Sequence, residues 1–330
     1  MFDYRTPDSV FAILRVHSVG NDSLPDPPPA CEHLVSELSH LLFPLYSSIA
    51  FVIGITLAKQ AITKGASPWT AVFLGNVWLT IFCSASAIVR GEFAPPSAWI
   101  AATGIGALFL GGQVLTYLAF QRGDVSIATP VLGLKVLIVA LFSIAIGGQA
   151  VPGRIWVAAL LASCGIGLVQ ASGGNSEPRN RWLTIGLASL AALALSLFDV
   201  SLQWAGSRWD SKLLLPFVFL AALVLSLGLL PWVDRPRRLK ELGAMKWMLA
   251  GTWLMGLQSL SISYGLATYG DAARMNIVYA LRGLWGVVLA WMLAEWLKTN
   301  EGQLPKRVMI LRLVGAVILV AAVITALMGG

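Results

Sequence analysis

The chain has 330 residues, of which 57% are hydrophobic and only 12% are charged. Soluble domains carry about 25% charged residues, so this composition excludes an ordinary soluble protein and indicates a polytopic membrane protein. The formal net charge of +7 is spread over predicted connections and helix ends, without a basic arm of the kind that binds nucleic acid. We therefore expect membrane lipids, and no nucleic acid, as partners of these charges.

The few cysteines and histidines exclude two further classes of protein. Three cysteines cannot form a disulfide framework. All three histidines precede the first predicted span, so the spans hold none for metal ligation or proton transfer. We expect no metal, no cofactor and no enzymatic activity.

Residues 1–40 precede the first long apolar stretch. Their apolar run Val10–Leu14 has five residues, too few for the core of a signal peptide. The proline-rich segment Asp22–Pro29 is typical of an extended, solvated linker. We expect a mobile N-terminal tail over residues 1–40.

Ten apolar stretches follow, each long enough to cross a bilayer as a helix of about 20 residues. A membrane span must satisfy its own backbone, so we predict an all-α polytopic membrane protein with ten transmembrane helices. In chain order the predicted spans are 41–63, 68–89, 97–120, 124–147, 154–172, 181–205, 212–233, 246–268, 271–297 and 307–328.

The sequence matches itself at an offset of 147 residues, which aligns Gly123-Asp124 with Gly270-Asp271 (271 − 124 = 147). The match covers the third and fourth predicted spans against the eighth and ninth. A shared polar pair at one offset is harder to produce by chance than matched apolar residues, so the match indicates a duplication.

We predict two five-helix repeats, 41–173 and 181–330. Gly165 in the fifth span aligns with Gly315 in the tenth after three extra residues are allowed. Because five is an odd number, the two repeats must enter the membrane from opposite sides. Inverted repeats are typical of secondary transporters, which bind substrate near the midplane between the repeats.

The same offset aligns two cations inside predicted spans, Lys135 in the fourth and Arg282 in the ninth. A charge near the middle of a span costs about 2.5–3.5 kcal/mol on insertion scales. A cation that recurs at equivalent positions therefore predicts an anionic or polar ligand at the centre of the protein.

Segment 124–169 resembles the closing helix pair of each half in the ten-helix, EamA-like branch of the drug/metabolite transporter superfamily. Gly148-Gln149 stands where that family usually shows Gly-Glu, and Ala294-Glu295 occupies the similar place in the second half. The resemblance covers about residues 41–328 and implies a transporter of ten helices in two halves.

The chain departs from the family near Lys135 and Arg282, where the family commonly has an apolar residue or a proline. Triose-phosphate translocators, which are phosphate-carrying relatives, place basic residues on the corresponding fourth and ninth helices. Their local sequence differs, so the resemblance only suggests recognition of phosphate.

Asn276, Tyr279 and Arg282 recur every third residue of the ninth predicted span, with Gly283 beside the cation. On a continuous helix they form a polar stripe suited to the wall of a substrate site. Arg282 would offer its planar fork to a carboxylate or phosphate. Alternatively, Arg282 pairs with a fixed protein carboxylate and only orders the bundle.

In the fourth predicted span we expect Pro130 to bend the helix near Lys135. Lys135 either meets a ligand directly or carries a proton. Asp199 lies inside the sixth span, with Gln203 one turn later on the same face. An acid there marks a proton-coupling group or the counter-charge of one of the two cations.

Gln203 is a candidate for lining the substrate site. Three amides inside other spans are further candidates, although an amide of this kind more often makes an interhelical hydrogen bond. They are Asn76, Gln113 and Gln258.

These features predict a secondary active transporter that moves a small polar metabolite, anionic or zwitterionic, by alternating access. Protons or a counter-substrate would drive it, and it would act as a monomer or homodimer in a bacterial inner membrane. The alternative is a flippase for a lipid with a phosphate headgroup, which would need a lateral opening. An intramembrane enzyme is a third class, for which the sequence holds no nucleophile motif.

Two arguments on orientation disagree. Odd-numbered connections hold 14 Lys and Arg residues and the opposite side holds seven, which places the odd connections in the cytoplasm and both termini outside. The family resemblance implies that both termini are cytoplasmic. We follow the charge count and expect both termini outside the cytoplasm.

Overall fold

The computed structural model describes residues 39–90, 94–122, 125–146, 148, 150–169, 181–293 and 306–328. Within these ranges the chain forms helices and no strand, which confirms the all-α prediction. The predicted tail, 1–40, lies outside the described residues except for its last two positions, so its mobility stays a prediction.

Helices occupy all ten of the predicted spans, with the fourth and ninth spans each divided into two. One short helix, α10, was not predicted and lies in the basic connection after the seventh span. The elements are η1 (Ser39–Leu41), α2 (Leu42–Thr63), α3 (Pro68–Arg90), α4 (Pro96–Arg122), α5 (Val125–Gly133), α6 (Lys135–Ala145), α7 (Gly153–Val169), α8 (Arg181–Gly206), α9 (Ser211–Ser226), η2 (Leu227–Trp232), α10 (Pro236–Glu241), α11 (Met245–Tyr269), α12 (Ala272–Tyr279), α13 (Arg282–Leu293) and α14 (Lys306–Leu327).

Seven helical stretches among the described residues are long and apolar enough to cross a membrane. The apolar helix α7 is shorter, at 17 residues, and α11 carries more polar side chains. The chain is therefore an integral membrane protein. The count of ten spans stays a prediction.

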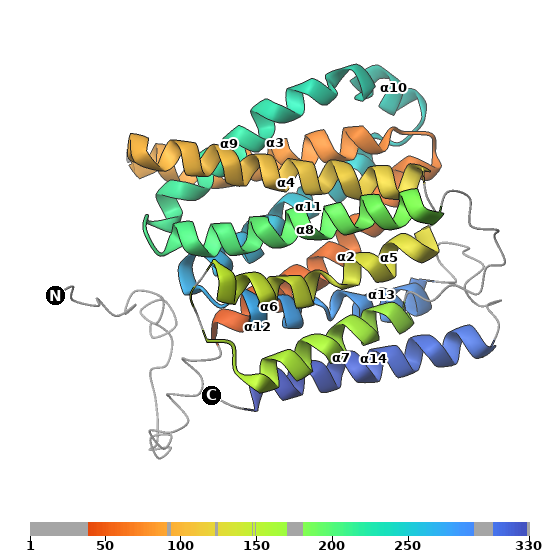
Figure 1. The fold of residues 1–330 in the computed structure, drawn as a ribbon. Coiled ribbons are helices and arrows are strands. Elements are labelled where there is room, and N and C mark those ends of the chain that lie inside the picture. The colour runs from red at the N-terminus through yellow and green to blue at the C-terminus, as the bar shows by residue number, and fades with distance from the viewer. Residues whose placement is uncertain are drawn as a thin grey trace, which may run out of the picture. The chain divides into compact units, whose positions relative to one another are not determined.

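The helices pack in a pattern that repeats when each span is exchanged with the span five places later. The first span packs along the eighth, α2 on α11, as the sixth packs along the third, α8 on α4. The fifth and tenth spans, α7 and α14, lie side by side (Figure 1). A duplicated five-span unit would produce this pairing, and the two repeats stay a prediction.

Helices α7 and α14 approach closely through the two aligned glycines. A Cβ atom on Gly165 would lie 3.0 Å from the carbonyl oxygen of Gly315, and one on Gly315 would lie 2.8 Å from that of Gly165. Both distances are too short for a side chain, so the helix pair depends on glycine at both positions.

The fourth and ninth spans are broken at equivalent residues. The N–H of Leu134 donates to the carbonyl of Val131 at 3.1 Å, and the N–H of Leu281 donates to that of Val278 at 3.1 Å. Each bond closes a tight four-residue turn, and each leucine is followed by the cation that begins the next helix. The two breaks are therefore related by the same 147-residue offset as the sequence (281 − 134 = 147).

Proline does not explain both breaks. Pro130 lies inside α5, four residues before the first break, as expected for a bend in this span. The ninth span contains no proline between Ala272 and Leu293, yet it breaks at the equivalent place.

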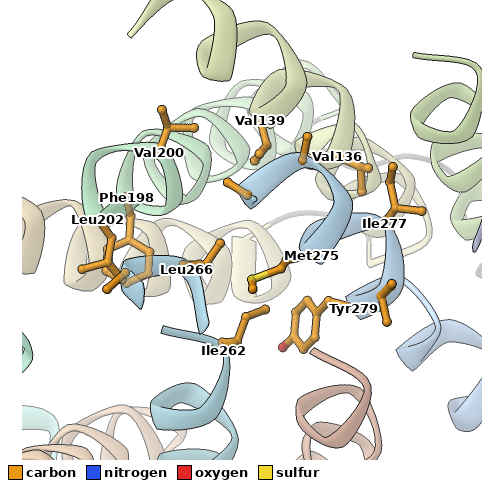
Figure 2. Packing of buried hydrophobic residues seen from close by; sticks show 14 of the residues in the cluster. Val136, Val139, Phe198, Val200, Leu202, Ile262, Leu266, Met275, Ile277 and Tyr279 are labelled. Carbon is orange, nitrogen blue, oxygen red and sulfur yellow. The ribbon is translucent and has the colours of Figure 1, made fainter. Parts of the chain in front are cut away.

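The apolar core surrounds the first half of the ninth span, α12. Figure 2 shows its buried side chains together with those of α6, α8 and α11. They include Val136, Val139, Phe198, Val200, Leu202, Ile262, Leu266, Met275, Ile277 and Tyr279. Both broken spans are thus anchored near their polar residues.

Candidate functional site

Lys135 and Asp199 form a buried ion pair between α6 and α8. The Nζ atom of Lys135 lies 2.7 Å from Oδ2 of Asp199, and the two side chains are 13% and 4% exposed. The same Oδ2 atom accepts a hydrogen bond of 2.8 Å from Nδ2 of Asn276 on α12. We name Lys135, Asp199 and Asn276 the Asp199 junction, because one carboxylate oxygen joins α8 to both broken spans.

The junction neutralises the cation of the fourth span. Two opposite charges that are buried together offset the cost of leaving water, whereas removal of one partner leaves an uncompensated charge and costs about 3–5 kcal/mol. Of the two roles that the sequence left open for Asp199, the structure contains the ion pair, and its partner is Lys135.

Serine hydroxyls satisfy backbone carbonyls at the first break. Oγ of Ser163 on α7 donates to the carbonyl of Gly133 at 3.2 Å, and Oγ of Ser196 on α8 donates to the carbonyl of Lys135 at 3.3 Å. A break frees carbonyl groups at the end of the preceding helix, such as that of Gly133, and these need partners away from water. These two serines therefore help to hold Lys135 at the start of α6.

Arg282 has a different environment at the second break. Its guanidinium carbon lies 4.6 Å from the ring centroid of Tyr279 and 5.1 Å from that of Phe51 on α2. Among the described residues, no ion pair joins Arg282 to a carboxylate. A guanidinium is a planar fork of N–H donors that can bind a carboxylate or a phosphate while it also contacts aromatic rings. We name Arg282, Tyr279 and Phe51 the Arg282 site.

Neighbouring helices hold the aromatic part of the Arg282 site. The hydroxyl of Tyr279 donates to Oε1 of Gln258 on α11 at 3.2 Å, and Gln258 donates in turn to Oγ of Ser259 at 2.7 Å. Nε1 of Trp285 on α13 donates to Oγ of Ser48 on α2 at 3.0 Å. The site is thus built from α2, α11 and both halves of the ninth span.

Gln203 and Asp271 position the start of α12. Oε1 of Gln203 accepts the N–H of Ala272 at 3.1 Å, and Oδ1 of Asp271 accepts the N–H of Arg274 at 3.2 Å. Asp271 is therefore the N-cap of α12. The structure uses the amide of Gln203 to bind backbone rather than to join the Asp199 junction.

Asn76 and Gln113 form a separate pair between α3 and α4. Nδ2 of Asn76 donates to Oε1 of Gln113 at 3.3 Å, while Oδ1 of Asn76 is buried without a hydrogen-bond partner. No contact described for this pair reaches the Asp199 junction or the Arg282 site. Its role as part of a substrate pathway stays a prediction.

The predicted stripe on the ninth span differs from the structure. The helix breaks between Tyr279 and Arg282, so spacing along a continuous helix does not relate them. Asn276 bonds to α8 and Tyr279 bonds to α11. A Cβ atom on Gly283 would lie 3.1 Å from Cδ1 of Leu319, so this glycine serves packing against α14 instead of the wall of a site.

Sequence reasoning missed Phe51, Ser163 and Ser196. Phe51 is one of 13 phenylalanines, and nothing in the sequence distinguishes it. Ser163 recurs with Ala159 and Gly167 at four-residue spacing, and small residues in such a stripe are typical of helix packing. Ser196 precedes Asp199 by three residues, so helical periodicity could have placed both on one face of α8.

The fold and the site define a polytopic helical membrane protein with two broken spans and a cation at each break. Residues 38–170 match the model of the EamA-like transporter family. This part of the chain is therefore similar to the family, which is part of the drug/metabolite transporter superfamily. Its members are membrane transporters of small molecules and not enzymes.

The fold also occurs among solved structures. One crystal structure of a protein aligns with 85% of this chain and 96% of its own chain, with a TM-score of 0.62 and 18% sequence identity. At that identity the likeness shows the fold alone. No curated protein matches the chain.

Proposed function

We propose that the protein is a secondary active transporter for a small polar metabolite with one anionic group, acting in a bacterial inner membrane. The observation that carries this proposal is Arg282, a cation inside a predicted span that aromatic faces hold and that no described carboxylate neutralises. The charges of Lys135, Asp199 and Arg282 sum to +1 (+1 − 1 + 1). A single anionic group on the substrate would bring this region to neutrality.

Alternating access would use the two broken spans. Asn276 and Tyr279 both lie on α12, and they connect it to the Asp199 junction and to the Arg282 site respectively. An anion that pulls on Arg282 would therefore shift the same short helix that bonds to Asp199. Broken helices at a repeat interface are typical of transporters in which the two halves move around the substrate.

Asp199 is the coupling group in this proposal. A proton on Asp199 would weaken its hold on Lys135 and Asn276 together, because both donate to the same oxygen atom. Coupling to protons would then link occupancy of the Arg282 site to movement of α6 and α12. Exchange for a counter-substrate with the same anionic group is the alternative form of coupling.

A ligand screen tests the proposal. The purified protein is heated with anionic, zwitterionic and cationic metabolites, because a ligand of the folded state raises the apparent melting temperature by mass action. We expect stabilisation by some anionic or zwitterionic compounds in the wild type and none of these shifts in Arg282→Gln. The matched control is Arg208→Gln, since Arg208 is an exposed arginine that also stacks on a ring, 3.9 Å from the centroid of Trp204.

Compounds that stabilise the protein are then followed into proteoliposomes. Uphill uptake that needs Arg282 supports the transporter. Flipping of a labelled phosphate-headgroup lipid without uptake of any soluble compound would favour the flippase instead. Stabilisation that is equal in the wild type and in Arg282→Gln would contradict a role of Arg282 in binding.

A further inference from the structure

Exposed cations gather where two connections meet at one end of the helices, between α2 and α3 and around α10. We name these cations the basic platform; they are Lys59, Lys64, Arg235, Arg237, Arg238, Lys240 and Lys246, all exposed. Within residues 59–70 and 233–246, all of which the structure describes, Glu241 is the one exposed carboxylate. The platform therefore carries a large excess of positive charge.

A buried carboxylate fixes the shape of the platform. Asp234 accepts hydrogen bonds from the N–H of Ser67 at 2.5 Å and from Oγ1 of Thr70 at 3.3 Å, and its own N–H donates to that Oγ1 at 2.8 Å. Nη1 of Arg238 lies 3.1 Å from its Oδ1 atom. Asp234 thus ties the α2–α3 turn to α10, and the cations around it are held by folded backbone.

The apolar side of α10 faces the protein. Leu239 is buried in a small cluster with Ala61, Ala66 and Met248 from the ends of the neighbouring helices. The basic residues on either side of Leu239 are turned outward. Helix α10 therefore presents its charged side chains to the outside, while its apolar side chain packs against the rest of the protein.

Exposed apolar and aromatic side chains lie next to the platform. Leu230 and Trp232, at the end of η2, are 47% and 59% exposed. They end the seventh span, which continues directly into the basic connection. A tryptophan between an apolar span and a group of cations is typical of the level of lipid headgroups.

We propose that the basic platform binds the headgroups of anionic phospholipids. Two features favour lipid over a soluble anion: the cations are fixed in position beside the end of a span, and the exposed side chains of Leu230 and Trp232 offer contact to acyl chains. The negative surface of a cytoplasmic leaflet attracts basic segments at this level. The site is independent of the transport proposal, and it places this end of the protein at the cytoplasmic leaflet.

The test compares two triple variants of the full-length protein in mixed micelles. One is Lys64→Gln/Arg237→Gln/Lys240→Gln, which spares Arg238 because that residue supports Asp234. The matched control is Arg154→Gln/Arg208→Gln/Lys212→Gln, which removes three exposed cations from connections on the other side of the predicted spans. Binding of phosphatidylglycerol and of phosphatidylcholine is measured by native mass spectrometry and by the shift in melting temperature, at low and at high salt.

We expect the platform variant to bind phosphatidylglycerol about fivefold more weakly per lost cation at low salt, or about 100-fold in total. The loss should shrink at high salt, and phosphatidylcholine binding should not change. The control variant should bind phosphatidylglycerol like the wild type. Equal loss in the two triple variants, or binding of soluble polyglutamate in preference to phosphatidylglycerol, would overturn the lipid site.

Discussion

The fourth and ninth spans break at equivalent residues but use their cations differently. At the first break Lys135 is neutralised by Asp199 and its backbone is held by serine hydroxyls. At the second break Arg282 lies on aromatic faces, without a carboxylate partner among the described residues. The surrounding helices thus give one cation a carboxylate partner and the other two aromatic partners. Under the proposed function, Arg282 is the cation that binds the ligand.

The largest expected effect tests whether the ion pair of Lys135 and Asp199 stabilises the fold. Asp199→Ala leaves the ammonium group of Lys135 buried without a partner, so we expect the free energy of unfolding to fall by about 3–5 kcal/mol. Lys135→Ala/Asp199→Ala removes both charges and should recover part of that loss. Denaturant unfolding in detergent measures both variants. If the double variant is no more stable than Asp199→Ala, the instability of Asp199→Ala does not come from the unpaired charge of Lys135.

The second-largest expected effect tests whether Arg282 binds a ligand. Arg282→Gln removes one charge-assisted hydrogen-bonding group, which is worth about 1.5–3 kcal/mol, so the dissociation constant should rise roughly 10- to 150-fold. The free energy of unfolding should hardly change. Arg282→Lys should restore binding only in part, because a planar fork becomes a point charge. Calorimetry with a compound from the ligand screen measures all three proteins.

Lys135→Gln is the counterpart of that experiment. If the two cations differ as the structure indicates, this variant should lose stability more than affinity, the reverse of Arg282→Gln. Loss of affinity with full stability in both variants would mean that the two cations act alike on the ligand and would remove the distinction between the breaks.

A smaller effect is expected at Phe51. Phe51→Leu keeps an apolar side chain on α2 but removes one of the two rings that Arg282 contacts. A cation–π contact is worth about 0.5–2 kcal/mol, so binding should weaken by roughly two- to thirtyfold. Phe198→Leu is a suitable control, since Phe198 is a buried phenylalanine of α8 that packs on Phe109. Equal losses of affinity in both would assign the effect to packing.

The smallest effect concerns the cap that begins the ninth span, in the turn between α11 and α12. Burial raises the pKa of Asp271, but the nearby imidazole of His40, 3.6 Å from Oδ2, and the charge and N–H of Arg274 outweigh burial, so its pKa lies below the ordinary value of 3.8. The charged cap therefore stabilises the folded state above pH 3.8, and this contribution is lost as the pH falls through the lowered pKa.

Asp271→Asn isolates that contribution. Because Asn keeps the capping oxygen, the variant should be less stable than the wild type at neutral pH only by the value of a charge near a helix N-terminus, about 0.3–1 kcal/mol. The difference in melting temperature between the two proteins should narrow as the medium is acidified below pH 3.8. If the difference in melting temperature stays constant down to pH 3, the variant is destabilised by the changed shape of the side chain and not by the loss of its charge.

The sequence predicts the helices of this fold well, because hydropathy and turn residues act locally. The equivalent cations also follow from the sequence, since the repeat is visible in Gly-Asp and in the leucine before each cation. The break in the ninth span could not be predicted, because no proline precedes it. Pro130 indicates a bend, but the helix ends only at Leu134.

The partners of the cations depend on which spans lie together, and no local pattern encodes that. Asp199 could equally have faced Lys135 or Arg282 as far as its own helix shows. The contact between Arg282 and Phe51 joins residues more than 200 positions apart. Packing of α2 against the ninth span selects Phe51, and its sequence neighbours give no sign of it.

The shared oxygen of Asp199 has a consequence for how the two halves move. Lys135 and Asn276 both donate to Oδ2, rather than one to each oxygen of the carboxylate. A turn of this side chain about its χ1 bond would break both contacts in the same event, whereas a half turn about χ2 only exchanges two equivalent oxygens. The contacts of α8 with the fourth span and with the ninth span would then be lost together, so intermediates that keep only one of these contacts should be rare.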